Sequence, residues 1–158
     1  MSAYLLLKFA HIIGATVLLG TGAGIAFFMF MAHRTGDAAT VAATARIVVT
    51  ADYLFTATAV VAQPITGILL VRTVGYDLTE GWILASIALY LVTGAFWLPV
   101  VWMQTKMRDL AATAAGKGEA LPAAYRRLYR WWFACGFPAF FAVLAIFWLM
   151  IARPDLGL

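Results

Sequence analysis

The sequence predicts an all-α integral membrane protein, a single domain (residues 1–158) in which four transmembrane helices form an antiparallel bundle. Three observations predict this fold class. Hydrophobic residues make up 65% of the chain and charged residues only 11%, whereas soluble proteins average about 45–50% apolar and about 25% charged. Four separate runs are long and apolar enough to cross a bilayer. The basic residues are concentrated in alternate connections between those runs.

The four apolar runs cover residues 4–32, 47–74, 82–104 and 131–152. Each exceeds the roughly 20 residues that a helix needs to cross about 30 Å of hydrocarbon. Aromatic residues gather near the ends of the runs, as is typical of membrane interfaces; they are Tyr4, Tyr76, Trp82, Trp102, Trp131, Trp132 and Trp148. The mean hydropathy of +0.93 excludes a disordered chain, which would be poor in apolar residues.

The distribution of lysine and arginine predicts the orientation. Eight of the eleven fall in the connections 33–46 and 105–130, and three (Lys8, Arg72 and Arg153) fall on the other side. The positive-inside rule therefore places both connections in the cytoplasm and both termini on the outer, periplasmic side of a bacterial inner membrane. This placement also accounts for the net charge of +4 without a nucleic-acid partner. The single cysteine, Cys135, excludes a disulfide within the chain.

The two cytoplasmic connections carry helix signals. Asp37 is placed to cap a helix that continues through Ala38–Ala45 into the second run. Leu121-Pro122 precedes the helix that leads into the fourth run. The stretch Ala111–Ala120, which contains Gly116 and Gly118, is expected to be the flexible part.

Two ionisable residues share a face of the first run, because Lys8 and His11 are three positions apart. Lys8 is shallow enough to serve as an interfacial anchor. His11 should lie about 10 Å below the outer surface, so it must either hydrogen-bond a neighbouring helix or bind a ligand. Imidazole at such a depth is a common ligand of haem iron or another transition metal.

Matching depths across the bundle suggests partners for His11. Met150, near the end of the fourth run, falls in the same layer and offers the thioether of a His/Met axial pair. Arg72 and Lys8 are placed to pair with haem propionates near the outer surface. The cofactor-binding set is therefore His11, Met150, Lys8, Arg72 and Gly14, with His11 as the iron ligand and Met150 as the second axial ligand.

Gly14 belongs to a series of glycines in the first run that also includes Gly20, Gly22 and Gly24. A smooth helix face of this kind suits a flat macrocycle. Close packing of another helix is the simpler interpretation, since Gly20 and Gly24 form a GxxxG pair. The same pair is where we expect a homodimer or another membrane protein to pack.

A second set of metal-binding side chains lies at the cytoplasmic end. Met29, Met31 and His33 close the first run, while Met103 and Met107 share a face at the end of the third. Thioether and imidazole groups suit Cu(I), which makes copper a minor alternative cofactor. Methionine is equally a flexible filler of apolar cores.

Asp52 is the acidic residue of the second run. Its two interpretations are an ion pair with Arg46, which we favour, and a proton relay. The second, third and fourth runs each contain a proline that could kink the helix and help to open a cavity; they are Pro64, Pro99 and Pro138. Kinked helices together with Asp52 are the features that a transport or permeation subunit would use.

The first run carries a recognisable pattern, Leu7-Lys8-x-x-His11-Ile12-Ile13, followed by glycines and a closing His33. It resembles the first helix of HemJ-type membrane protoporphyrinogen oxidases and of the related CopD-like membrane proteins. The Pro64-x-x-Gly67 pair is similar to their second helix. Over its whole length the chain looks more like a family of small predicted integral membrane proteins of unknown function. The resemblance implies a helical bundle that binds haem b through His11 and handles porphyrins or electrons.

One departure from the HemJ-type pattern bears on enzymatic activity. Those proteins carry further basic and histidine residues in the third helix, whereas residues 82–103 contain neither lysine nor histidine here. A HemJ-like oxidoreductase activity therefore rests on the resemblance alone. The function we expect is haem b binding with an electron-transfer or porphyrin-related redox role. The alternatives are a cofactor-free transport subunit and a structural subunit that packs against another membrane protein.

Overall fold

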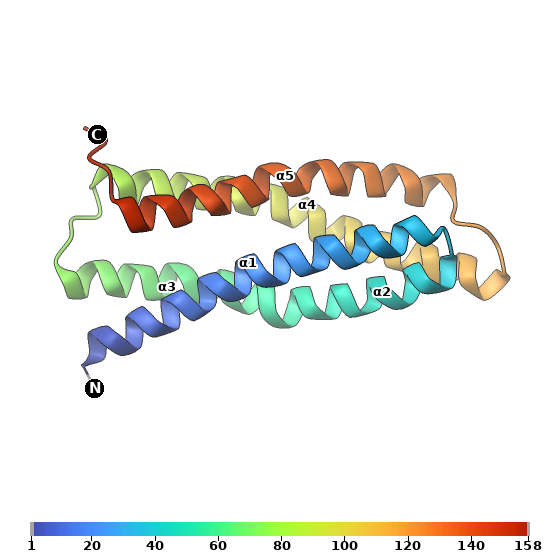
Figure 1. Cartoon of the computed structure of the whole chain (residues 1–158), viewed down its shortest axis with the longest axis horizontal. Coiled ribbons are helices and arrows are strands. Elements are labelled where there is room, and N and C mark those ends of the chain that lie inside the picture. The colour runs from blue at the N-terminus through green and yellow to red at the C-terminus, as the bar shows by residue number, and fades with distance from the viewer. Residues whose placement is uncertain (1, 158) are drawn as a thin grey trace.

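A computed structural model describes residues 2–157 and contains only helices and their connections within that range. The elements are α1 (Ala3–Thr35), α2 (Ala38–Ala51), the π-helix η1 (Asp52–Thr56), α3 (Ala57–Val74), α4 (Gly81–Lys117) and α5 (Ala123–Ala152). Because α2, η1 and α3 follow one another without a break, they form one rod from residue 38 to residue 74 (Figure 1). The four resulting helices are each long and apolar enough to cross a membrane, which confirms the predicted fold class.

The two ends of the bundle differ in their connections (Figure 1). Both termini lie at one end, together with the short α3–α4 connection; we call this the terminal end. The α1–α2 and α4–α5 connections lie at the opposite end, which we call the basic end because eight of the eleven lysines and arginines belong to it. These names leave the orientation in the membrane open.

The helix ends are capped by local hydrogen bonds. Asp37 Oδ2 accepts from the Thr40 amide at 2.7 Å and from the Thr40 hydroxyl at 2.6 Å, so the predicted cap of α2 is confirmed. Gly36 ends α1 in the left-handed region, at φ 68°, where glycine carries no steric penalty. Pro122 immediately precedes α5, as the sequence predicted.

Three helices continue well beyond the predicted spans. The connections predicted as 33–46 and 105–130 shrink to two short turns, because α1 runs to Thr35 and α4 to Lys117. The stretch predicted to be flexible is wrong over Ala111–Lys117, which is helical with Ala111 and Ala114 buried. Alanine has the highest helix propensity, and burial of its small side chain allows close helix packing. At 1.5 Å per residue α4 is about 55 Å long, well beyond a hydrocarbon core of about 30 Å.

The hydrophobic core lies in the basic half of the bundle. It is built from α1, α2, α4 and α5 and contains Met29, Val41, Met107 and Tyr125, all of which are fully buried. Trp132 joins this core, and Trp82 is also buried. Trp102, Trp131 and Trp148 are exposed.

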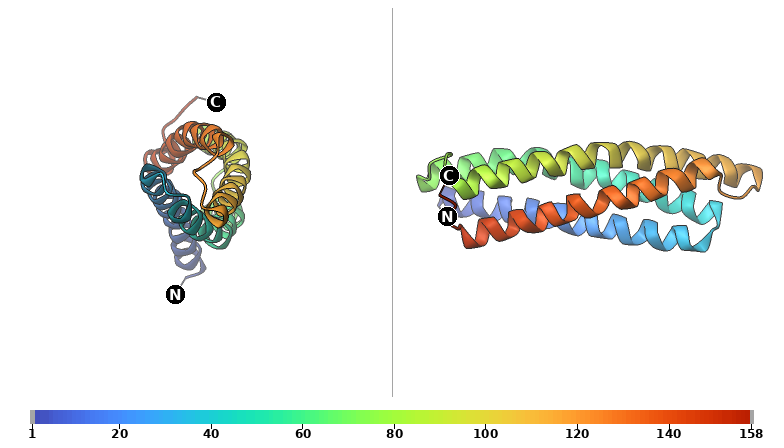
Figure 2. Two further views of the ribbon diagram at one scale, coloured as in Figure 1. Left: turned by 90° about the vertical axis from the view of Figure 1, so that its right-hand side faces the viewer. Right: turned by 90° about the horizontal axis from the view of Figure 1, so that it is seen from above.

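The terminal half is arranged as two helix pairs. There α1 packs mainly on α3 and α4 mainly on α5. Figure 2 shows the first turns of α1 standing out from the ring formed by the other helices. Most side chains of this half are half-buried or exposed, with few fully buried positions among them. The terminal half therefore has a much smaller packed core than the basic half.

Candidate functional site

The predicted ligand His11 lies against α3, where it forms what we call the His11 cluster with Gly14, Gln63, Thr66 and Gly67. His11 Nδ1 is 2.8 Å from the hydroxyl oxygen of Thr66. The side-chain amide of Gln63 donates to the backbone carbonyl of His11 at 2.9 Å. These two bonds hold both the ring and the backbone of His11 on one face of α3.

The hydrogen bonds of Thr66 suit one tautomer of His11. Its hydroxyl oxygen lies 2.8 Å from the backbone carbonyl of Ala62 and 3.2 Å from that of Gln63. When the single hydroxyl proton is directed to one of these carbonyls, the Thr66 oxygen accepts from His11 and Nδ1 carries the hydrogen. In the neutral ring Nε2 then keeps its lone pair. A histidine that ligates a metal has this tautomer, with its other nitrogen hydrogen-bonded to a protein acceptor.

Two glycines lie where α1 meets α3. A Cβ atom on Gly14 would collide with the Gln63 side-chain amide, and one on Gly67 would lie 3.4 Å from His11 Cε1. Gly14 thus leaves the space that Gln63 occupies, whereas a Cβ atom on Gly67 would make an ordinary van der Waals contact with the imidazole ring. The sequence marked Gly14 as part of the cofactor site; the structure places it beside His11 through Gln63.

Within residues 2–157 no hydrogen bond or ion pair joins the His11 cluster to the other predicted site residues, which are Lys8, Arg72 and Met150. Lys8 is exposed one turn earlier on α1, with its Nζ 5.7 Å from the centre of the Tyr4 ring. Arg72 is exposed in the last turn of α3. Met150 is half-buried near the end of α5, a helix that packs mainly on α4. All three lie towards the terminal end, as predicted, but only His11 and Gly14 are brought together.

The structure brings together a second polar cluster that the sequence did not predict. We call it the Asp52 network, after the carboxylate at its centre, which is only 3% exposed. Asp52 Oδ1 accepts from the indole N–H of Trp97 and Oδ2 from the side-chain amide of Gln104, both at 3.3 Å. The oxygen of Gln104 in turn accepts from the indole N–H of Trp132 at 3.1 Å. Three helical segments, η1, α4 and α5, therefore meet at one buried carboxylate.

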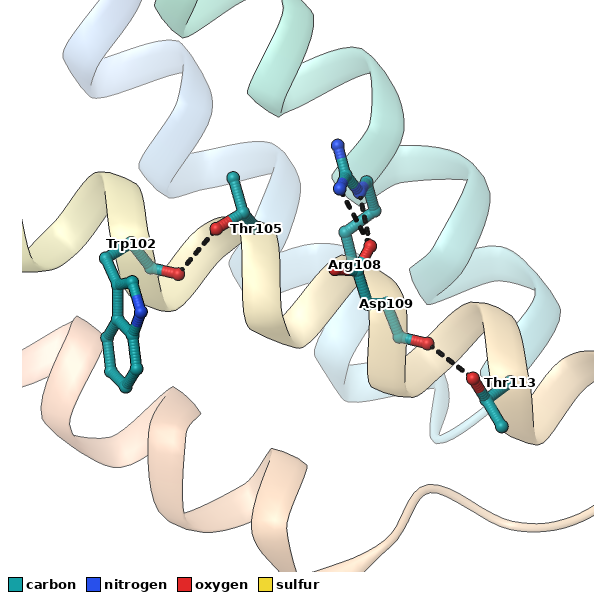
Figure 3. A network of polar contacts seen from close by, with 5 residues as sticks. All are labelled: Trp102, Thr105, Arg108, Asp109 and Thr113. Atoms are coloured by element: carbon teal, nitrogen blue, oxygen red, sulfur yellow. Dashed lines mark hydrogen bonds and ion pairs between the residues drawn. The ribbon is translucent and has the colours of Figure 1, made fainter.

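The favoured ion pair between Asp52 and Arg46 is wrong. Arg46 is exposed, and within residues 2–157 the one ion pair joins Arg108 to Asp109 at 2.8 Å. Figure 3 shows that pair on α4, where neighbouring threonines bond back to the same helix. Six positions along a helix separate Arg46 from Asp52 by about 240° around the axis, so the two side chains leave the helix on different faces.

The backbone around Asp52 is also unusual. Residues Asp52–Thr56 form a π-helical turn, a feature that often marks functional positions inside α-helices. The hydroxyl of Thr56 is buried one turn from Asp52. The sequence offered one signal for this site, which is an isolated acidic residue in an apolar run. Nothing in the sequence indicated the π-helical turn.

The residues proposed for copper lie in the basic half. Met29, Met103 and Met107 are buried in the hydrophobic core, whereas Met31 is exposed. His33 stacks on Tyr129, with ring centres 3.6 Å apart, and its Nδ1 is 3.3 Å from the hydroxyl of Tyr125. Three of the methionines thus serve as core residues, and His33 is held against the Tyr129 ring.

The GxxxG pair packs against no other helix within residues 2–157. A Cβ atom on Gly20 would have no neighbour within 4 Å, and one on Gly24 would meet only Phe28 of the same helix. Helix packing inside the described chain therefore does not explain these glycines. The predicted homodimer at this face stays a prediction.

Together these features define an integral membrane protein of four long helices with one half-buried histidine site and one buried carboxylate site. The chain belongs to the family described as predicted integral membrane protein (DUF2269), whose model matches residues 5–154. No curated protein and no solved structure matches the chain.

Proposed function

We propose that this membrane protein binds haem b through His11 and has an electron-transfer or porphyrin-related role. The observation that supports the proposal is the hydrogen bond between His11 and Thr66. With the Thr66 oxygen accepting from Nδ1–H, the Nε2 lone pair is free for iron. The likeness of the first helix to HemJ-type and CopD-like proteins supports the same ligand.

The donor chemistry of the cluster fits a haem axial ligand. Thr66 fixes the plane and tautomer of the imidazole, and Gln63 anchors the backbone that carries it. Lys8 and Arg72 are exposed towards the same end and have no carboxylate partner within residues 2–157, so both are free to pair with propionates. Bound iron would supply one-electron redox chemistry, with its potential set by the axial ligands and the surrounding polarity.

We place the space for a macrocycle in the terminal half of the bundle. Two surface hollows, at Arg127–Ala134 and at Arg46–Phe55, do not include His11. The α1–α3 pair and the α4–α5 pair contact each other little compared with the contacts within each pair. Haem would therefore be held between these pairs, by His11 of α1 and Met150 of α5.

The first test is the visible spectrum of the full chain purified in detergent from haem-replete cells. We expect a Soret band that is lost in His11→Ala and kept in His33→Ala, the matched change at the other histidine. A folded wild-type protein without the band, or a band that survives His11→Ala, would contradict the proposal. In Met150→Leu the haem should remain bound but change from a six-coordinate to a five-coordinate spectrum.

A second test addresses the tautomer. Thr66→Val keeps the shape of the side chain and removes the acceptor for Nδ1–H, so haem affinity should fall roughly 10–100-fold. Thr58→Val is the control, because Thr58 lies on the same helix, is exposed and bonds only to the backbone of its own helix. Equal affinities in the two variants would show that Thr66 does not orient the ligand.

A further inference from the structure

Polar side chains line one face of the η1–α3 rod in an otherwise apolar segment. Asp52, Thr56, Gln63 and Thr66 are separated by 4, 7 and 3 positions, which is the spacing of a single helix face. All four are buried or half-buried, whereas Tyr53, Phe55, Val61 and Ile65, at other positions around the rod, are exposed. The polar residues therefore point into the bundle.

The facing helix α4 carries a matching set. Ser86, Tyr90, Trp97 and Gln104 follow one helix face by the same spacing rule and are buried or half-buried. The Tyr90 hydroxyl donates to the backbone carbonyl of Val60, which joins the two faces midway. We call the combined set, from the His11 cluster to the Asp52 network, the polar seam.

Asp52 lies at the end of this seam that is nearer the basic end of the bundle, and no cationic side chain within residues 2–157 pairs with it. Elements packed against η1 are α1, α2 and α3, and α4 supplies its two hydrogen bonds. Between His11 and His33, α1 has no titratable residue. Arg46 on α2 and Lys106 on α4 are exposed, and the half-buried Tyr90 donates to Val60. An ionised carboxylate in such surroundings is costly, and binding a proton removes the charge.

The seam is closed towards the basic end. Beyond Asp52 the polar chain passes to Gln104 and stops at Trp132, whose indole N–H can donate but cannot accept a proton. The surrounding positions are the fully or nearly fully buried core residues Val48, Met103 and Met107. Towards the terminal end, by contrast, the seam continues through Thr56 to Gln63 and to His11, which is half-buried.

We propose that Asp52 takes up and releases a proton that reaches it from the terminal end along the polar seam. The buried Thr56 hydroxyl, which lies one turn from Asp52, is the last relay group. The interval of seven residues between Thr56 and Gln63 is about 10 Å, so water molecules or the Tyr90 hydroxyl must bridge it. The uptake forms one O–H bond on the carboxylate and consumes one proton from the terminal side.

A proton fits the chemistry of the Asp52 carboxylate better than a metal cation does. Both carboxylate oxygens face N–H donors, from Trp97 and Gln104. A sodium or calcium ion would require several oxygen ligands turned towards it. A proton needs only one carboxylate lone pair and a donor to deliver it. The route shares Gln63 and His11 with the proposed haem site, but it can be tested without haem, because neither Asp52 nor Thr56 belongs to the His11 cluster.

The test is infrared difference spectroscopy of the haem-free full chain in lipid vesicles as the pH is changed. We expect a protonated carboxyl band that is absent in Asp52→Asn and unchanged in Asp109→Asn, the exposed ion-paired aspartate. After a pH jump, Thr56→Val should slow the appearance of that band roughly a hundredfold, while Thr58→Val should not change the rate.

Two results would overturn the proposal. One is the absence of any carboxyl band in the wild-type protein that Asp52→Asn removes. The other is an identical rate in Thr56→Val and Thr58→Val, which would mean that protons reach Asp52 by another route. If Asp52→Asn does not fold, isotope labelling of aspartate in a variant with Asp37, Asp77, Asp109 and Asp155 all changed to Asn assigns the band to the one remaining aspartate. Copper or haem loading is not needed for any of these measurements.

Discussion

Gln63 fills the space that a side chain on Gly14 would occupy, and its amide donates to the backbone carbonyl one turn earlier, at His11. The contact joins α1 to α3 in the terminal half, where the bundle has little other buried surface. It also fixes the register of the two helices, because a shift of one residue would bring the Gln63 amide against a side chain larger than glycine. The position of His11 on α3 thus depends on a residue that carries no chemistry itself.

Gly14→Ala should therefore destabilise the α1–α3 pair. The new methyl group displaces the Gln63 amide and removes its hydrogen bond, at a cost of about 1–3 kcal/mol when buried groups lose their partners. Gly22→Ala is the control, since its Cβ would meet nothing within 4 Å, and helix propensity alone should stabilise it by up to about 1 kcal/mol. Unfolding by SDS titration in mixed micelles gives both values. Equal stabilities would mean that Gln63 relaxes without loss.

The fold class was predictable because it depends on composition and on the length of apolar runs, which need no knowledge of neighbours. The helix ends were less predictable. Residues 33–35 and 105–117 carry charges and were interpreted as connections, yet they are helical because their backbone bonds are local and Ala111 and Ala114 are buried. A charge pattern predicts the membrane boundary, but the helix itself continues past it.

The partners of the polar residues were not predictable, because they depend on how each helix is rotated about its axis. For His11 the sequence left a hydrogen bond to a threonine and metal ligation as alternatives, and the Thr66 bond is compatible with both. Asp52 was paired with a basic residue of its own helix, whereas its donors come from α4, at Trp97 and Gln104. Those residues are 45 and 52 positions away in the chain.

Gln104 links Asp52 to Trp132, so its loss should leave two buried polar groups unpaired. We expect Gln104→Leu to lower the free energy of unfolding by about 2–5 kcal/mol, since each orphaned group costs about 1–3 kcal/mol. Thr105→Val, at the next position on α4, changes a hydroxyl that bonds only to the Trp102 carbonyl of its own helix and should cost far less. SDS titration measures both variants. A loss no larger than that of Thr105→Val would show that water replaces the Gln104 amide.

The cap of α2 should respond to pH. Hydrogen bonds from the Thr40 hydroxyl and from the Thr40 amide hold the pKa of Asp37 below its usual value of 3.8. Because the folded pKa is the lower one, the cap stabilises α2 fully above pH 3.8 and loses its contribution as the pH falls through the folded value. Hydrogen exchange of amides 38–45 should accelerate in Asp37→Ala at neutral pH, and the difference from wild type should shrink in acid.

A matched variant tests whether this acceleration belongs to the cap. Asp77 accepts from the amide and hydroxyl of Thr79 in the α3–α4 connection, and those bonds lower its pKa in the same way. Asp77→Ala removes a comparable carboxylate without touching α2, so exchange at residues 38–45 should stay at the wild-type rate. Acceleration in both variants would trace the effect to net charge instead of capping.

The orientation predicted by the basic residues can be tested with single cysteines. Cys135→Ser removes the one native thiol, after which Asp155→Cys and Glu119→Cys place exposed thiols at the terminal and basic ends. A membrane-impermeant maleimide should label Asp155→Cys on intact cells and Glu119→Cys only after lysis, because moving eight basic residues across the membrane is disfavoured. The reverse pattern would place the His11 cluster on the cytoplasmic side, and the polar seam would then draw its proton from the cytoplasm.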